Sequence, residues 1–209
     1  MIELIVKVAL AYLLGTVMGG LIIARLRGVD LRGSGSGNVG ATNALRTQGK
    51  MFAAAVLLID LIKGVLAVTL LPAWLAPTVD WLPYACGIAV TVGHVFPIWF
   101  GFRGGKGAAT LAGVFASLMP WAFLWMMAAF VSALLMTGMV AGATLSAAGA
   151  AVIYALWMHG LTGWPVEILF VILMAVLVVY THRGNILRMR YGTESRFDRL
   201  HLSRRWRER

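Results

Sequence analysis

The segment MFAAAVLLIDLIKGVLAVTLL, from Met51 to Leu71, decides the fold class of this chain. An α-helix needs about 20 predominantly apolar residues to cross the hydrocarbon core of a membrane, and this segment supplies them without a break. Comparable apolar runs lie on either side, from about Leu4 to Ala24 and from about Trp81 to Phe100. Their unbroken character predicts helices rather than the alternating strands of an outer-membrane barrel.

The composition extends this conclusion to the whole chain. Hydrophobic residues make up 60% of the 209 residues and charged residues only 12%, which leaves too little polar surface for a soluble domain of this size. From Ala108 to Tyr180 the chain is nearly uncharged and has room for four further spans, some of them short. We therefore expect an all-α integral membrane protein, a bundle of about seven transmembrane helices that forms a single polytopic domain over residues 1–209.

The distribution of cations predicts the orientation of this bundle. Lysine and arginine gather in three segments, at about 27–50, 101–107 and 182–209, whereas the connections around Pro77 and Gly163 contain neither. Because basic loops stay in the cytoplasm, the N-terminus is expected outside and the C-terminus inside. The arginine-rich end is expected to lie against anionic lipid headgroups, and no aromatic pattern supports nucleic-acid binding.

The first basic segment contains a glycine-spaced polar loop that is typical of an anion cradle. Its glycines permit tight turns and allow backbone amides to face a ligand, and its hydroxyl and amide side chains can bond a phosphate. The residues expected to contact a substrate here are Gly35, Ser36, Gly37, Asn38, Gly40, Ala41, Thr42, Asn43 and Arg46.

The second basic segment combines glycines and a lysine with the start of an apolar helix, where the helix dipole favours an anion. Its spacing is not that of a Walker A motif, so a nucleotide is not implied. The residues expected to contact a substrate here are Arg103, Gly104, Gly105, Lys106, Gly107 and Thr110. His94, at the end of the preceding span, is open to two interpretations, a substrate contact or a structural hydrogen bond.

Polar residues also follow the last apolar run and interrupt the second one. Directly after the last run, the expected substrate contacts are His182, Asn185, Arg188 and Glu194. Within the second run, Asp60 and Lys63 are three positions apart and therefore share one face of the helix. We expect them to pair with each other or with the loops and to support the scaffold.

Three motifs occur in order along the chain and together are specific to one family. They are G-S-G-N-V-G-A-T-N (Gly35 to Asn43) followed by Arg46, G-H-V-F-P-I (Gly93 to Ile98) with R-G-G-K-G (Arg103 to Gly107), and H-R-G-N-I (His182 to Ile186) with G-T-E (Gly192 to Glu194). In these motifs the chain resembles the PlsY family of bacterial acyl-phosphate:glycerol-3-phosphate acyltransferases. It departs from the family at Arg103, where lysine is common, and at Gly184, where glutamate is frequent, which argues against a catalytic role for position 184.

The resemblance implies an activity and a location. The activity is transfer of a fatty acyl group from acyl-phosphate to the 1-hydroxyl of sn-glycerol 3-phosphate, which gives 1-acyl-sn-glycerol 3-phosphate (lysophosphatidic acid) and phosphate in an early step of phospholipid biosynthesis. The location is the bacterial cytoplasmic (inner) membrane, and we expect a monomer without cofactor or metal. A small anion or phosphate transporter is the alternative, but its glycine interruptions would lie at the bilayer centre rather than at the ends of spans.

The resemblance and the residue chemistry together suggest roles for four catalytic candidates, Lys106, His182, Ser36 and Arg46. Lys106 and the amides of its loop are expected to hold one phosphate, and the other is expected to lie against Arg46, Ser36, Asn38 and His182. Ser36 has no base beside it in sequence, which favours a phosphate ligand over a nucleophile. We expect direct attack of the substrate hydroxyl on the acyl carbon, with its proton passing to a donor phosphate oxygen or to His182.

Overall fold

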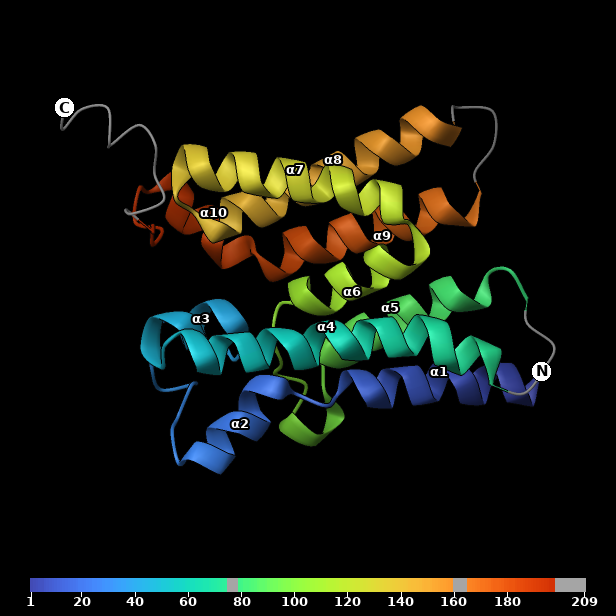
Figure 1. The fold of residues 1–209 in the computed structure, drawn as a ribbon, viewed down its shortest axis with the longest axis horizontal. Coiled ribbons are helices and arrows are strands. Elements are labelled where there is room, and N and C mark those ends of the chain that lie inside the picture. Colours follow the sequence, from blue (N-terminus) through green and yellow to red (C-terminus); the bar gives the residue numbers. More distant parts are fainter. Residues whose placement is uncertain (75–78, 160–164, 198–209) are drawn as a thin grey trace. The chain divides into compact units, whose positions relative to one another are not determined.

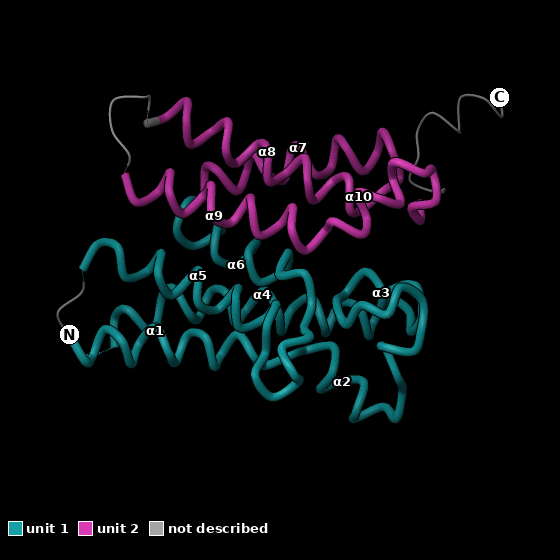
Figure 2. Tube along the Cα trace, turned by 180° about the vertical axis from the view of Figure 1, so that it is seen from behind, with its two compact units in different colours: residues 1–119 teal, residues 120–209 magenta. Residues whose placement is uncertain are grey.

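The computed structural model describes residues 1–74, 79–159 and 165–197, and in these ranges it contains helices and loops but no strand (Figure 1). The all-α prediction is confirmed for this part of the chain. The chain divides into two compact units, residues 1–119 and residues 120–209 (Figure 2). The connections around Pro77 and Gly163 and the tail beyond residue 197, on which the predicted orientation partly depends, lie outside the described residues.

Unit 1 contains the first two basic segments. Its helices are α1 (Ile2–Gly15), α2 (Gly19–Arg27), α3 (Ala41–Thr47), α4 (Lys50–Ala73), α5 (Leu82–Val95), the short 3-10 helix η1 (Ile98–Phe100) and α6 (Ala108–Leu118). Helix α4 packs against α5 and α6, and α1 packs against α5 (Figure 1). Helix α4 therefore lies at the centre of this unit, and it includes the whole predicted span from Met51 to Leu71.

Unit 2 contains the third basic segment. Its helices are α7 (Pro120–Thr137), α8 (Val140–His159), α9 (Val166–Thr181) and α10 (Arg183–Arg190). Helix α8 packs against both α7 and α9, and α10 departs from the direction of α9 by 58°. The Phe197 amide donates a hydrogen bond of 2.8 Å to the Gly138 carbonyl, so the segment after α10 is joined to the turn between α7 and α8.

Several helices are long enough to cross a membrane. In the described residues, five apolar helical segments meet this criterion, and α9 with α10 would be a sixth if the bent pair is one span. Helix α6 is apolar but has 11 residues, a length of about 17 Å against a hydrocarbon core of about 30 Å. The expected total of seven is reached only if α6 also counts as a span.

The first span differs from the continuous helix expected between Leu4 and Ala24. Helix α1 ends at Gly15, Met18 is extended (φ −94°, ψ 98°), and α2 begins at Gly19. The Thr16 hydroxyl donates to the Leu13 carbonyl at 2.6 Å in the last turn of α1. A break inside a membrane span leaves backbone carbonyls without helical partners, so other groups must bond them.

Glycines allow the helices of unit 1 to approach closely. A side-chain carbon at Gly93 of α5 would overlap the Tyr12 carbonyl of α1, and one at Gly15 would overlap the Val90 carbonyl. Helices α4 and α6 meet in the same way, since a side chain at Gly64 would overlap the Thr110 carbonyl. Small residues at these positions therefore permit close contact between the helices of unit 1.

Replacing Gly93 with alanine is expected to destabilise unit 1 by about 1 to 3 kcal/mol, because backbone rather than a flexible side chain occupies the space. Gly149 of α8 is the matched control, since a Cβ there would meet no atom within 4 Å. Thermal unfolding in detergent should show a lower midpoint for Gly93→Ala and an unchanged or higher one for Gly149→Ala. Equal midpoints for the two variants would contradict the close packing of α1 against α5.

Candidate active site

The first glycine-rich loop is organised around the buried side chain of Asn43. Its amide nitrogen donates to the carbonyls of Leu31 (3.1 Å) and Ser34 (3.0 Å), and its oxygen accepts the Ser36 amide at 2.9 Å. Only 1% of Asn43 is exposed. The predicted substrate contact of Asn43 remains a prediction, and the bonds that the structure gives it serve to shape the loop.

Glycine is required at two places in and beneath this loop. Gly35 has a positive φ of 59°, and a side chain there would meet Asn43 and Thr47. Gly20, in the first turn of α2, lies so close to the loop that a Cβ would overlap the Val39 carbonyl. The loop backbone is therefore held between Asn43 on one side and α2 on the other.

The other predicted residues of this loop lie in α3 or in the segment just before it. Gly40 precedes the helix as its N-cap, and Ala41 and Thr42 are its first two residues. Ser36 and Arg46 are exposed, whereas Asn38 is half-buried. The expectation that the loop amides face a ligand needs correction at two positions. The Ser36 amide donates to Asn43, and the Gly37 amide donates to the Ser34 carbonyl at 3.0 Å.

Removing the Asn43 side chain is expected to open the loop. The Leu31 and Ser34 carbonyls and the Ser36 amide then lose their hydrogen-bond partner. Leaving such a group unsatisfied costs about 1 to 3 kcal/mol of stability where the group is buried. Hydrogen exchange of the Ser36 amide should become at least about tenfold faster in Asn43→Ala. Ser34→Ala is the control, because its hydroxyl makes only a surface bond to Asp30 in the same loop. Unchanged exchange at Ser36 in Asn43→Ala would contradict the role assigned to this side chain.

The second loop folds back onto the end of α5. The Gly104 amide donates to the Val95 carbonyl (3.0 Å) and the Gly105 amide donates to the His94 carbonyl (3.1 Å). A side chain at Gly104 would overlap the His94 carbonyl, and one at Gly105 would overlap the His94 ring. The expectation that these two amides bind a phosphate is corrected, since both donate within the protein.

The second loop leads into the N-terminus of α6, as predicted. Gly107 is the N-cap of this helix, with a positive φ of 81°. Lys106 immediately precedes it and is half-buried, whereas Arg103 is exposed. An anion-binding role for this loop therefore depends on the Lys106 side chain and on the partial positive charge of the α6 N-terminus.

Arg32 connects the two loops of unit 1. Its guanidinium donates to the Arg103 carbonyl at 2.8 Å and lies 5.8 Å from the centre of the Phe100 ring, a cation–π arrangement. Sequence reasoning missed this residue, because the two partners of the hydrogen bond are 71 positions apart and neither carries a local signal of pairing.

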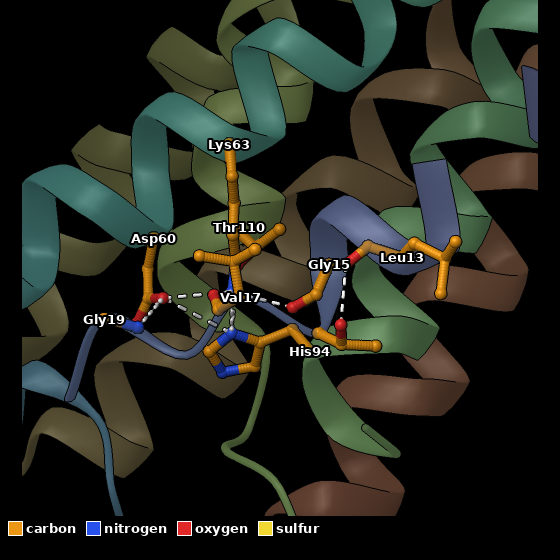
Figure 3. A network of polar contacts seen from close by, with 9 residues as sticks. Leu13, Gly15, Val17, Gly19, Asp60, Lys63, His94 and Thr110 are labelled. Atoms are coloured by element: carbon orange, nitrogen blue, oxygen red, sulfur yellow. Dashed lines mark hydrogen bonds and ion pairs between the residues drawn. The ribbon is translucent and has the colours of Figure 1, made fainter. Parts of the chain in front are cut away.

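A buried polar cluster lies beneath the second loop (Figure 3). The Lys63 ammonium is 3.0 Å from the Asp60 carboxylate and 2.8 Å from Nδ1 of His94. The Thr110 hydroxyl is 3.3 Å from the same His94 nitrogen. The predicted pairing of Asp60 with Lys63 is confirmed, and these contacts fit the structural interpretation of His94.

The Lys63 ammonium also bonds the break in the first span. It donates to the Gly15 carbonyl at 3.0 Å and to the Val17 carbonyl at 2.7 Å. Gly15 is the last residue of α1, and Val17 lies within the interruption between α1 and α2. On the other side of the interruption, the amide of Gly19, the first residue of α2, donates to Asp60 at 3.4 Å. The break is therefore stabilised by the charged pair of α4, which explains how it is tolerated inside a membrane span.

In unit 2, His182 joins α9 to α10. Its Nδ1 lies 2.9 Å from the Val178 carbonyl, which can only accept, so Nδ1 carries the proton of the neutral ring. The lone pair is then on Nε2, which is the arrangement that a general base requires. The residue is buried, with 3% exposed.

Glu194 fixes α10 in place. One of its oxygens accepts the Asn185 amide at 2.8 Å and the other pairs with Arg188 at 2.8 Å. The substrate contact expected of Asn185 remains a prediction, and its side-chain nitrogen donates to Glu194. Glu194 is mostly buried and both of its oxygens are engaged, so its contacts are those of a structural residue.

The comparisons with known proteins agree with the motifs. A sequence model of the family "Glycerol-3-phosphate acyltransferase" matches residues 5–192. Proteins named glycerol-3-phosphate acyltransferase are 39% identical in Geobacter sulfurreducens, over 94% of this chain and 99% of that protein, and 44% identical in Myxococcus xanthus, over 91% and 97%.

Two solved structures are also similar in fold. They are crystal structures of PlsY (YgiH), an integral membrane glycerol 3-phosphate acyltransferase, in its glycerol 3-phosphate form and its lysophosphatidic acid form. Their TM-scores are 0.83 and 0.81 at 36% identity, and each match covers 93% of this chain and 95% of the solved chain. These matches confirm the predicted integral membrane fold and the resemblance to PlsY, and the chain belongs to the glycerol-3-phosphate acyltransferase family.

Proposed function

We propose that this chain transfers a fatty acyl group from acyl-phosphate to the 1-hydroxyl of sn-glycerol 3-phosphate and releases lysophosphatidic acid and phosphate. The observation that carries the proposal is the linkage of two basic glycine-rich loops in unit 1 through Arg32 and the Arg103 carbonyl. Both substrates contain a phosphate, and each of these loops brings a cation, Arg46 in one and Lys106 in the other.

The two loops receive different phosphates in this proposal. Lys106 and the N-terminus of α6 hold one phosphate, and Arg46 holds the other together with Ser36 and Asn38. Asn43 acts indirectly, because its three hydrogen bonds keep the backbone around Ser36 in shape. The cations stabilise the charge that develops on the leaving phosphate as the acyl group departs.

The proposed transfer is direct. The hydroxyl oxygen of glycerol 3-phosphate forms the new ester bond to the acyl carbon, the bond from that carbon to the phosphate oxygen breaks, and phosphate leaves with the electron pair. The hydroxyl proton passes to Nε2 of His182, whose lone pair is set by the bond from Nδ1 to the Val178 carbonyl. Positioning and charge stabilisation then supply most of the rate enhancement.

The proposed setting is the bacterial cytoplasmic membrane, with the chain acting as a monomeric, single membrane domain. The N-terminus lies outside, the C-terminus lies in the cytoplasm, and α6 is counted as the short seventh span. The basic segments support this orientation, since arginines at the cytoplasmic surface also gain about 1 kcal/mol each from anionic lipids.

Proteoliposomes distinguish this enzyme from an anion transporter. Vesicles containing the protein, supplied with acyl-phosphate and glycerol 3-phosphate, should form lysophosphatidic acid and should admit radiolabelled phosphate no faster than empty vesicles. Phosphate entry without formation of lysophosphatidic acid would overturn the proposal in favour of transport.

A further inference from the structure

Lys63 is a buried cation that joins three separate parts of unit 1 (Figure 3). Its ammonium nitrogen lies 3.0 Å from the Gly15 carbonyl, 2.7 Å from the Val17 carbonyl, 3.0 Å from Asp60 and 2.8 Å from Nδ1 of His94. Only 3% of Lys63 is exposed. The side chain therefore ties α4, the break between α1 and α2, and the end of α5 to one atom.

The charge of Lys63 follows from the carboxylate beside it. Its ammonium has three hydrogens, which are shared among four neighbours, the Gly15 and Val17 carbonyls, the Asp60 carboxylate and the His94 ring nitrogen. The Asp60 carboxylate at 3.0 Å compensates the positive charge. A charged side chain inside a membrane span is costly unless it is paired in this way.

The charge on Lys63 decides the tautomer of His94. An ammonium has no lone pair, so it can only donate to Nδ1 of His94 at 2.8 Å, and one of its three hydrogens is shared between this nitrogen and an oxygen neighbour. The proton of the neutral ring then lies on Nε2. Two other groups near Nδ1 are consistent with this assignment. The Asp60 oxygen is 3.6 Å away, beyond hydrogen-bonding distance, and the Thr110 hydroxyl at 3.3 Å can donate to the same nitrogen.

His94 in turn lies against the second loop. Its carbonyl accepts the Gly105 amide at 3.1 Å, and its Nε2 is so close to Gly105 that a side chain there would overlap the ring. Lys106 is the next residue along the chain. The orientation of the His94 ring therefore limits where the backbone just before Lys106 can lie.

We propose that Lys63 is a positioning residue, which holds His94 in the Nε2–H tautomer and thereby fixes the loop that carries Lys106 relative to the break between α1 and α2. The inference deepens the proposed function, and its kinetic consequence, a lower kcat when Lys63 is replaced, rests on that function. Its structural consequence, the tautomer of His94, is independent of any activity.

The kinetic test compares Lys63→Met, which keeps the length of the side chain, with the wild type in detergent. We expect kcat to fall by roughly 10²-fold, because a loop displaced by about 1 Å misplaces the phosphate ligand. KM for both substrates should change by less than about threefold, because Lys106 itself is retained. Lys63→Arg should recover part of kcat, since a guanidinium also donates without accepting.

The spectroscopic test measures the ring nitrogens of ¹⁵N-histidine-labelled protein, with His94→Gln used to assign the His94 signals. In the wild type we expect Nε2 protonated and Nδ1 unprotonated, and in a folded Lys63→Met this preference should be lost. A protonated Nδ1 in the wild type would overturn the inference even if Lys63→Met does not fold.

The two proposals can fail separately. An active wild type with an equally active Lys63→Met would overturn the positioning role and leave the acyltransferase proposal intact. A wild type that makes no lysophosphatidic acid would overturn the acyltransferase proposal, while the His94 tautomer would still decide the structural claim.

Discussion

Lys106→Ala is expected to lower kcat/KM by about 10²- to 10³-fold, the cost of removing one charged group that stabilises a developing anion. Two backbone amides of this loop, those of Gly104 and Gly105, donate to the end of α5. The half-buried Lys106 side chain is thus the main source of positive charge between Gly104 and α6. Steady-state rates of lysophosphatidic acid formation measure the effect.

Lys50→Ala is the matched control for this variant. Lys50 is exposed, begins α4 and belongs to the first basic segment, but it lies in none of the three motifs. We expect Lys50→Ala to change kcat/KM by less than about threefold, because a single exposed cation adds little to the general attraction of anionic substrates. A similar loss in both variants would show that Lys106 acts as part of a diffuse positive field and not as a phosphate ligand.

His182→Asn is expected to lower kcat by at least about 10²-fold, the lower end of what a general base contributes. Asparagine suits this test because its amide can still donate to the Val178 carbonyl, which His182 bonds at 2.9 Å. The change therefore removes the basic nitrogen while it keeps the bond between α9 and α10. Rates at saturating substrate isolate this effect from binding.

Arg190→Ala provides the control on the same helix, since Arg190 is exposed and lies outside the motifs. Its kcat should stay within about threefold of the wild type. If His182→Asn also stays within about tenfold, the proton is transferred to a phosphate oxygen of the donor and His182 is not the base.

The features of the fold that could be predicted from sequence are those set by local composition. The run from Met51 to Leu71 forms most of α4, and the spacing of Asp60 and Lys63 placed them on one face, where they pair at 3.0 Å. The break at residues 16–18 could not be predicted, because the run from Leu4 to Ala24 is predominantly apolar and its one charged residue, Lys7, lies well before the break. What stabilises the break is a lysine of another helix.

The two glycine-rich loops were predictable from sequence, but the contacts that their residues make within the fold were not. Glycine spacing identified the loops, yet it could not show that Gly104 and Gly105 are required by contact with His94 rather than by a ligand. Asn38 and Asn43 are both asparagines of the same glycine-rich loop and cannot be told apart in sequence. In the structure Asn43 is buried at the centre of the loop, whereas Asn38 is half-buried. Arg32 was missed because its partner lies far along the chain.

The central claim is direct transfer from acyl-phosphate to glycerol 3-phosphate, and a single-turnover measurement tests it most directly. The purified protein is mixed with acyl-phosphate and glycerol 3-phosphate, quenched at intervals, and assayed for lysophosphatidic acid, phosphate and protein-bound acyl groups. Direct transfer predicts that lysophosphatidic acid and phosphate appear together in equal amounts, with no acyl group on the protein. Release of phosphate before lysophosphatidic acid, with an acyl group on Ser36, would contradict it.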